Sequence, residues 1–422
     1  MTLLLLTLLQ DWKAGTAAEK ITPEEPVFLA GYASRNKPFT GVAGDLWAKA
    51  LALEDATGAK AVLITSDLLG LPAEVAEAVA ARIGLPRERI LLSSSHTHTG
   101  PALSPRDGRP ENVAYTKVLQ DKLVKVAEDA LKSLAPATLS WGLGMSNIPM
   151  NRREFTPRGV ILGVNARGPV DRSVPVLRVD GGAKVLLFQC ACHCTTCTGE
   201  IYEVTGDYAG FAQDHIQKEL PGTRAMFMAG CGGDANPYPR GTVELAKEHG
   251  ASLGREVLRV AAGKLQPVKG PLSAAFGHAE LPFESAKPLE ELKTLSKTGP
   301  SAQRGVFAAQ AALLEKGEKL PAHYRAPLGV WQFGDDLTLV ALSGEVVVDY
   351  VFRLEKALGP LKLWVAAYCN DVYGYLPSAR VLEEGGYETR GTYYGAPGIF
   401  APTAESVLVD KVKELAGQAG RK

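Results

Sequence analysis

The stretch Lys60–Ser94, KAVLITSDLLGLPAEVAEAVAARIGLPRERILLSS, contains the pattern that decides the fold class. It begins with an apolar run rich in β-branched residues at Lys60–Ser66 and ends with a second apolar run at Arg89–Ser94. Between them, Ala73–Ile83 repeats its apolar residues with the period of a helix. A strand, a helix and a strand in this order predict an α/β protein with substantially parallel pairing.

The same alternation recurs along the chain. Further strand patterns lie at Lys184–Cys190, Arg224–Ala229, Asp336–Ser343 and Lys362–Cys369. Further helical patterns lie at Asn112–Leu134, Tyr208–Leu220, Val243–Ala262, Ser301–Lys316, Val346–Leu358 and Ala404–Ala416. The polar turn Asp55–Lys60 joins the apolar stretch Leu46–Leu53 to the next strand, which adds some antiparallel pairing. We therefore expect an α/β fold with mixed, largely parallel sheets flanked by helices. The helical stretch Ser285–Lys319 separates the predicted strands into two groups, so the strands could form two sheet layers.

The composition indicates a folded protein without a polyanionic partner. Of the 422 residues, 46 are Lys or Arg and 46 are Asp or Glu, so the formal net charge is zero. A chain without a basic excess does not favour nucleic acid or an anionic membrane surface as a partner. Because 46% of the residues are hydrophobic, the chain can bury enough apolar surface to offset the entropy of ordering.

The N-terminal apolar run Thr2–Leu9 leaves the cellular compartment open. It is about half as long as the ~18 residues that a membrane-spanning helix needs, so no membrane span is predicted. The run resembles the apolar part of an export signal, but no positive residue precedes it and no Ala-x-Ala site follows it. Two alternatives remain for residues 1–11: a truncated signal of an exported protein, or a buried first strand of a cytoplasmic one.

Potential metal ligands follow several of the predicted strands. His96 and His98 follow the strand that ends at Ser94, and their spacing on extended backbone allows both to face one side. Three later strands are followed by His193, Glu345 and Tyr375. Ligands in open α/β sheets bind beyond the carboxyl ends of the strands, so we expect these side chains to meet. Imidazole and carboxylate suit zinc, and a catalytic zinc keeps one position open for a water that ionises near neutral pH.

Some of these residues also have a structural interpretation. Glu345 could instead place its charge at the N-terminus of the helix that follows it. Asp234 could bind backbone amides within its glycine-rich turn. The other four histidines are expected to be structural or solvated: His215, His249, His278 and His323.

Four of the six cysteines surround His193, within the run Cys190–Cys197. A structural zinc or iron–sulfur site is one interpretation of this run. On extended backbone, however, Cys192 and Cys194 point away from the face that carries His193, so they would not bind the same ion. We expect buried thiols or one disulfide.

Taken together, the motifs resemble those of the neutral ceramidase family, of the neutral/alkaline non-lysosomal type. The shared segments are Ala14–Pro23, Leu29–Tyr32, His96–Pro101, Asn151–Arg153, the strand ending at His193, Gly206–Gly210, Gly233–Pro237, Ser343–Glu345, and the stretch from Tyr375 through Tyr387–Glu388 to Tyr394–Gly395. Their order and spacing are shared over most of the chain. We accordingly expect residues 12–422 to form a single ceramidase-like catalytic domain, without the C-terminal immunoglobulin-like domain of full-length ceramidases.

The resemblance implies a set of site residues. It implies a zinc ion, Zn²⁺, held by His96, His193, Glu345 and Tyr375. It also implies that His98 acts as general base or acid near the metal-bound water, and that Arg152 holds the substrate or the developing oxyanion. Tyr387 matches a tyrosine that could add a hydrogen-bond donor there. An imidazole beside zinc can accept the proton of the attacking water and return it to a leaving amine. A cation beside zinc stabilises the tetrahedral oxyanion.

One departure from the family pattern lies at the active-site serine. The family's Gly-Asp-x-Ser-Pro-Asn motif reads GDANPY at Gly233–Tyr238, which places Asn236 at the serine position. Asparagine cannot act as a nucleophile but can donate and accept hydrogen bonds. A mechanism based on zinc and water therefore survives, whereas a serine-acyl mechanism does not.

The sequence thus predicts a zinc-dependent hydrolase of an amide or ester bond, acting on a small-molecule or lipid-like substrate. The expected lack of the immunoglobulin-like domain and of an apolar anchor, together with zero net charge, favours a smaller or more polar substrate than membrane-borne ceramide. Two alternatives remain open because of Asn236. One is a non-catalytic zinc-containing binding protein on the same scaffold, and the other is a zinc enzyme of different chemistry, such as a lyase or a glycosidase.

Overall fold

A computed structural model describes residues 11–103, 108–392 and 397–421. The apolar run Thr2–Leu9 lies outside the described residues, and so does the shared segment Tyr394–Gly395. The choice between a signal remnant and a first strand for residues 1–11 therefore stays open.

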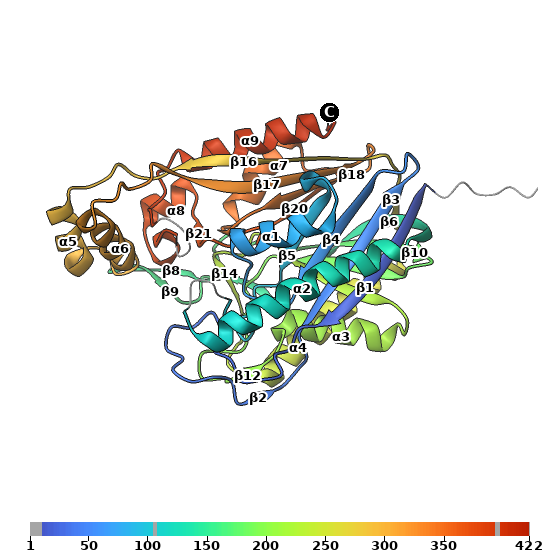
Figure 1. The fold of residues 1–422 in the computed structure, drawn as a ribbon, viewed down its shortest axis with the longest axis horizontal. Helices are drawn as coiled ribbons and strands as arrows, with labels where there is room; N and C mark the ends of the chain where they lie inside the picture. The colour runs from blue at the N-terminus through green and yellow to red at the C-terminus, as the bar shows by residue number, and fades with distance from the viewer. Residues whose placement is uncertain (1–10, 104–107, 393–396, 422) are drawn as a thin grey trace, which may run out of the picture.

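Two β-sheets form the centre of the molecule (Figure 1). The first runs in the order β13-β11-β10-β6-β1-β3-β4-β5, with β15 paired to β6, and the second in the order β16-β17-β18-β20. The strands of the first sheet are β1 (Trp12–Lys20), β3 (Trp47–Asp55), β4 (Lys60–Ser66), β5 (Ile90–Ser94), β6 (Ala135–Met145), β10 (Ser173–Gly181), β11 (Val185–Cys190), β13 (Arg224–Ala229) and β15 (Gln266–Val268). Those of the second are β16 (Leu272–Pro282), β17 (His323–Phe333), β18 (Leu337–Leu342) and β20 (Leu363–Ala366).

The sheets pack face to face through an apolar core. Leu63 and Leu187 from the first sheet share one buried cluster with Trp331, Leu339 and Trp364 from the second. Two sheet layers are therefore present, as one arrangement of the strand groups had suggested. The boundary between the layers falls between β15 and β16, and not at the helical stretch Ser285–Lys319.

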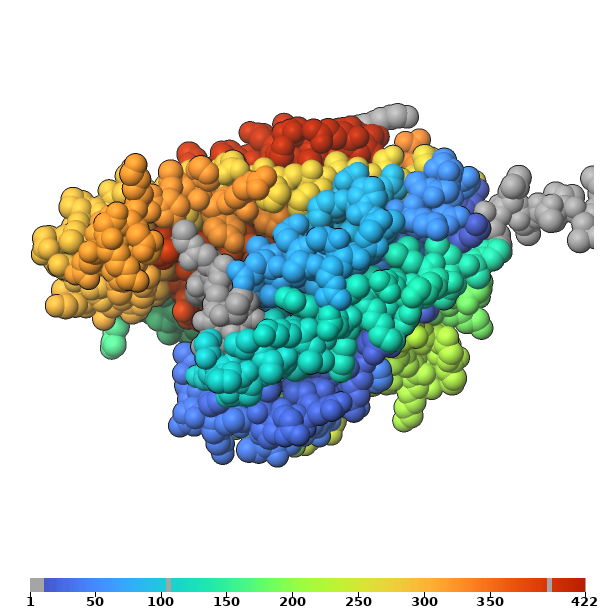
Figure 2. Space-filling model, in the orientation of Figure 1, coloured from blue at the N-terminus to red at the C-terminus, as the bar shows by residue number. Residues whose placement is uncertain are grey.

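Helices cover the outer faces of both sheets. Their bounds are α1 (Ala73–Ile83), α2 (Pro110–Lys132), α3 (Asp207–Glu219), α4 (Val243–Ala262), α5 (Leu289–Thr298), α6 (Arg304–Glu315), α7 (Asp349–Leu358), α8 (Ala379–Glu384) and α9 (Ala404–Gln418). Helices α1 and α2 pack on β3, β4 and β5, α3 and α4 on β10, β11 and β13, and α7 and α9 on the second sheet. Figure 2 shows α1 and α2 covering one face and α5 with α6 protruding at one end. No helix in the described part of the chain is both long and apolar enough to cross a membrane.

The prediction of largely parallel sheets is wrong, although a mixed α/β fold flanked by helices is confirmed. In the described part of the two large sheets, the parallel pairs are β4–β5, β11–β13 and β18–β20, and the other neighbours are antiparallel. These three pairs are the six strands that the apolar runs predicted. Parallel strands are buried on both faces and read as continuous apolar runs. Antiparallel strands such as β6, whose side chains alternate between buried and exposed, give a weaker apolar signal.

The carboxyl ends of the parallel strands meet at one edge of the two layers. Backbone bridges join them there, between Ser93 and Cys369 and between Gly230 and Ala366. Among the described residues, short strands form four separate two-stranded sheets: β2 (Gly41–Val42) with β12 (Glu203–Val204), β7 (Pro149–Asn151) with β14 (Ala235–Pro237), β8 (Arg153–Thr156) with β9 (Gly159–Leu162), and β19 (Glu345–Val346) with β21 (Tyr375–Leu376). The loops that leave these strand ends build the site.

Candidate metal centre

Four of the predicted ligands converge at this edge. Nε2 of His96 lies 3.2 Å and Nε2 of His193 lies 3.1 Å from Oε2 of Glu345. The hydroxyl oxygen of Tyr375 lies 3.2 Å from Nε2 of His193. Each of the four side chains belongs to a residue that is at most 5% exposed. We refer to His96, His193, Glu345 and Tyr375 as the metal cluster.

The hydrogen bonds of the two histidines show that the metal cluster fits a cation. Nδ1 of His96 lies 2.6 Å from the carbonyl oxygen of Leu69, and Nδ1 of His193 lies 2.8 Å from that of Gly232. A carbonyl oxygen can only accept, so each Nδ1 carries the proton and each Nε2 presents a lone pair. Both lone pairs then face a carboxylate oxygen of Glu345, which is also an acceptor. A metal ion between them removes this repulsion, and two nitrogen and two oxygen ligands suit zinc.

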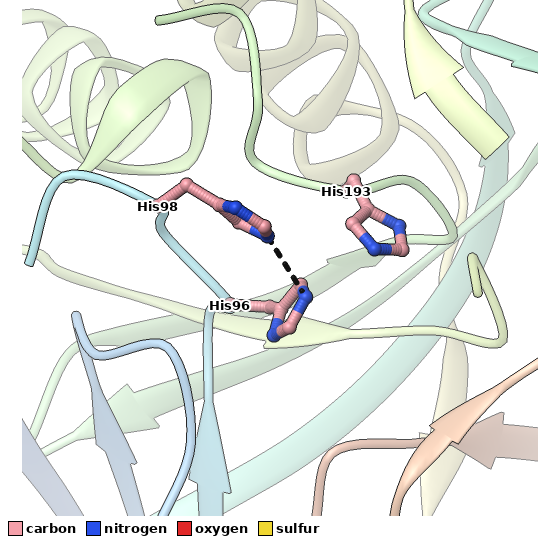
Figure 3. A group of neighbouring side chains, drawn as sticks. All are labelled: His96, His98 and His193. Atoms are coloured by element: carbon pink, nitrogen blue, oxygen red, sulfur yellow. Dashed lines mark hydrogen bonds between the residues drawn. The ribbon is translucent and has the colours of Figure 1, made fainter. Parts of the chain in front are cut away.

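His98 differs from the other two histidines of the site (Figure 3). Its Nε2 lies 3.1 Å from Nε2 of His96, and its Nδ1 has no hydrogen-bond partner among the described residues. The ligand atoms of His96, His98 and His193 all lie within 4.8 Å of one another, so His98 is close enough to be a ligand. Histidines that bind metals usually donate their second N–H to an oxygen. Because His98 lacks that support, the geometry favours a proton acceptor over a ligand.

Burial keeps His98 and His193 neutral. It lowers the pKa of His98 well below its usual value, and the neighbouring His96 and His193 lower it further. Burial, followed by the charge of Arg152, lowers the pKa of His193 to about 3. Neutral imidazole is the form that binds metals and accepts protons.

The backbone around the metal cluster is strained. His96, Tyr368 and Asn370 have φ angles of +62°, +57° and +63°, in the left-handed region that residues other than glycine rarely adopt. Each costs on the order of 1–3 kcal/mol and persists only where the surroundings hold it. The ring of Tyr368 lies 4.4 Å from that of His96, centroid to centroid. Gly31 approaches His98 so closely that a Cβ would lie 2.4 Å from its Nδ1, so this position requires glycine.

Arg152 connects the metal cluster to the rest of the cavity. Its Nη2 donates to the hydroxyl of Tyr375 (2.9 Å), its Nη1 to Oδ1 of Asn236 (3.2 Å) and its Nε to Glu388 (2.8 Å). Glu388 also accepts a hydrogen bond from Arg153 (2.6 Å). Although burial raises the pKa of Glu388, the charges of Arg152 and Arg153 bring it below its usual value. Glu388 therefore balances a charge that would otherwise be buried alone.

A cavity of about 420 Å³ opens over the metal cluster. Of the predicted residues, it is lined by His98, Arg152, Asn236, Tyr375 and Tyr387. The ring of Tyr387 lies 5.5 Å from that of Tyr375, centroid to centroid. The structure thus brings all eight predicted site residues together, either in the metal cluster or on the cavity wall.

The structure also decides several of the open interpretations. The carboxylate of Glu345 faces the histidines, and α7 begins only at Asp349, so Glu345 does not charge the N-terminus of that helix. Asp234 accepts from the backbone N–H of Val348 (2.9 Å) and from Asn151 (3.3 Å), so it joins two loops. The six cysteines are free and buried, and the group of His, Cys, Asp and Glu side chains close enough to share a metal ion within the described residues, His96, His98 and His193, contains none of them.

The four remaining histidines lie outside this group, as expected. His215 packs against Gly254 between α3 and α4, and the ring of His278 meets that of Phe276 edge to face. His249 bonds a backbone carbonyl, and His323 pairs with Glu280 at the surface.

The sequence interpretation gave no role to several residues that the structure places at the site: Gly31, Thr195, Arg240, Tyr368 and Glu388. Only Gly31 and Glu388 lie in segments shared with the ceramidases, and that resemblance was the one signal for them. Thr195, Arg240 and Tyr368 carry no such signal, because their contacts arise only from the way the loops fold together.

Comparison with known proteins identifies distant relatives, although no model of a protein family matches the chain. Neutral ceramidase A of Dictyostelium discoideum is 26% identical over 268 residues, which cover 55% of this chain and 36% of that protein. Neutral ceramidase B of the same organism is 27% identical over 242 residues, which cover 51% of this chain and 34% of that protein. The matched part thus spans about a third of the length of these curated relatives.

Two solved structures share the fold. A neutral ceramidase from Pseudomonas aeruginosa superposes with a TM-score of 0.76 at 20% identity, over 98% of this chain and 75% of that one. A ceramidase complexed with C2 superposes with a TM-score of 0.74 at 18% identity, over 96% of this chain and 75% of that one. The chain is therefore neutral ceramidase-like.

Proposed function

We propose that this protein is a zinc-dependent hydrolase that cleaves an amide or ester bond. The observation that carries the proposal is the pair of imidazole lone pairs of His96 and His193, which face the carboxylate of Glu345 at the base of a cavity. The names of the relatives, all ceramidases, support amide cleavage. As part of the same proposal, residues 12–422 act as one catalytic domain.

The residues around the metal cluster can divide the work of hydrolysis. When bound, zinc supplies a water that is nucleophilic at neutral pH and a Lewis acid for the carbonyl. Nε2 of His98 accepts the proton of the attacking water and returns it to the leaving amine or alcohol. The guanidinium of Arg152, held by Glu388, stabilises the negative charge that develops on the carbonyl oxygen. Asn236, which cannot form an acyl intermediate, contributes only hydrogen bonds.

Metal analysis of the purified protein tests the proposal first. We expect about one equivalent of zinc per chain, the stoichiometry of a mononuclear catalytic site, and its loss in His193→Ala. The control is His323→Ala, because His323 is exposed and lies outside the site. A panel of amides and esters should be hydrolysed by the zinc-loaded protein, inhibited by chelation and restored by zinc.

Three results would contradict the proposal in distinct ways. A zinc content far below one equivalent per chain, and no lower in His193→Ala, would show that the metal cluster does not bind zinc. Full zinc without turnover, accompanied by ligand-dependent thermal shifts, would favour the binding protein. Products whose masses lack added water would favour an eliminating enzyme.

A further inference from the structure

The cavity over the metal cluster is rich in positive charge. Two guanidinium groups, those of Arg152 and Arg240, line it, and no carboxylate does so among the described residues. The charge of Arg152 is balanced by Glu388 at 2.8 Å. Arg240, which is partly exposed, forms no ion pair with any residue in the described ranges. A cation that lines a ligand cavity without a counter-charge is free to bind an anion from outside the protein.

Arg240 is held in place by neutral groups. Its Nη1 donates to the hydroxyl of Thr195 (3.3 Å), and that hydroxyl donates to Oδ1 of Asn236 (3.1 Å). The nearby Glu200 is exposed. Hydrogen bonds from its own backbone and from Thr198 lower its pKa, and Arg240 adds to this effect without forming an ion pair. The guanidinium thus forms no ion pair within the described residues and leaves most of its N–H donors for a ligand.

Asn236 adds a further donor. Its Oδ1 accepts hydrogen bonds from both Thr195 and Arg152. Because arginine can only donate, the amide atom that faces it is the oxygen and not the nitrogen. Its Nδ2 has no hydrogen-bond partner among the described residues, and the residue lines the cavity. We refer to Thr195, Asn236 and Arg240 as the donor wall. A wall that offers an amide N–H₂ and a planar guanidinium fork suits a carboxylate, which accepts at both oxygens.

We propose that the donor wall binds a carboxylate of the substrate, so that the hydrolysed amide or ester carries a negative charge close to the scissile bond. This inference rests on the proposed hydrolase function and specifies its substrate class. The closeness follows from the chain of hydrogen bonds: Thr195 and Asn236 alone separate Arg240 from Arg152, which contacts Tyr375 of the metal cluster. Asn236 thus places a carboxylate-binding amide where the ceramidase motif has serine.

Matched substrates that differ in charge provide the test. N-octanoylglycine carries the carboxylate on the amine side of the amide, N-octylsuccinamic acid carries it on the acyl side, and N-octanoylglycinamide is neutral. With the zinc-loaded protein, we expect kcat/KM for one of the two acids to exceed that for the neutral amide by about 10- to 100-fold, as for a hydrogen bond between charged groups. The preferred acid shows which side of the bond faces Arg240.

Substitutions at Arg240 connect this preference to the donor wall. In Arg240→Gln the ratio of the two kcat/KM values should fall towards one, and Arg240→Lys should retain part of it. The ratio does not depend on the fraction of protein that is correctly folded. The control is Arg255→Gln, since Arg255 lies exposed on α4, outside the cavity, and should leave the ratio unchanged.

The outcomes separate this inference from the proposed function. If the neutral amide is hydrolysed as well as both acids, or if Arg240→Gln keeps the preference, the inference fails while the hydrolase stands. If nothing is hydrolysed, the proposed function fails, and calorimetry still decides the inference. Binding of either acid that exceeds binding of the neutral amide and is lost in Arg240→Gln supports the donor wall. Equal binding, or none, overturns it.

Discussion

The metal cluster and the donor wall meet in one cavity but rest on different parts of the fold. The residues of the metal cluster are at most 5% exposed and follow strands of the three parallel pairs, and both of its histidines are supported by backbone carbonyls. The donor wall lies on loops and on the short strand β14, with two partly exposed side chains and hydrogen bonds of 3.1–3.3 Å. Buried, strained backbone holds the metal cluster, whereas loops and a short strand hold the donor wall, which we propose binds substrate.

The largest effect should come from neutralising the metal cluster. In Glu345→Gln the histidine lone pairs lose the nearby anion, and the amide N–H₂ of glutamine can instead donate to one of them. Losing a residue that only hydrogen-bonds a metal ligand typically lowers metal affinity by about 10- to 100-fold. Because Glu345 is itself a proposed ligand, we expect a larger fall in zinc affinity, and a fall in hydrolysis with it. Chelator competition measures the affinity. Glu383→Gln, an exposed position on α8, is the control, and unchanged zinc binding in Glu345→Gln would contradict the assignment.

His98→Gln should separate catalysis from metal binding. It removes the proton acceptor, so kcat should fall by about 100- to 10,000-fold, the usual contribution of a general base. Nδ1 of His98 has no hydrogen-bond partner among the described residues, which is unusual for a metal ligand. The zinc content should therefore remain that of the unsubstituted protein. Metal analysis and kcat of the same sample decide this. If the zinc is lost together with activity, His98 is a ligand and the metal cluster has to be redrawn around the histidine trio.

Asn236→Ser should change substrate preference and leave the metal in place. Serine is one bond shorter and offers no amide N–H₂, so the preference for the carboxylate substrate should fall by about 10-fold, the effect of one hydrogen bond to a charged group. The ratio of kcat/KM for the preferred acid and for N-octanoylglycinamide measures the change. New hydrolysis of a short-chain ceramide in this variant would further show that position 236 sets substrate choice. A preference that stays the same would leave Arg240 as the sole recognition group.

The smallest effect should come from the buried thiols beside the metal cluster. Cys192→Ala removes a small buried side chain and should lower the free energy of unfolding by about 1 kcal/mol, as an ordinary core substitution does. Zinc content and kcat/KM should not change, because burial raises the thiol pKa well above its usual value and keeps the sulfur protonated. Urea denaturation and metal analysis test both parts. Loss of zinc would show that the run Cys190–Cys197 holds metal.

Much of the metal cluster could be predicted from the sequence, but little of the donor wall. His96, His193 and Glu345 directly follow apolar strands, and this position in the sequence places them at one edge of a sheet. Arg240 follows no strand that an apolar run marks, and nothing near it in the sequence indicates Thr195 as a partner. The antiparallel strands were underestimated for a related reason, since the half-exposed alternation of β6 yields a weak apolar signal.

The sequence by itself determined the six strands of the parallel pairs, most of the helices and the kinds of ligand at the strand ends. These features depend on apolar runs, helical periodicity and residue types within short segments, so they can be read locally. Only the tertiary structure decided the antiparallel pairing, the balance of Arg152 by Glu388 across 236 residues, and the juxtaposition of Thr195, Asn236 and Arg240. Such contacts form where loops from distant parts of the chain meet, and no local pattern specifies which loops will do so.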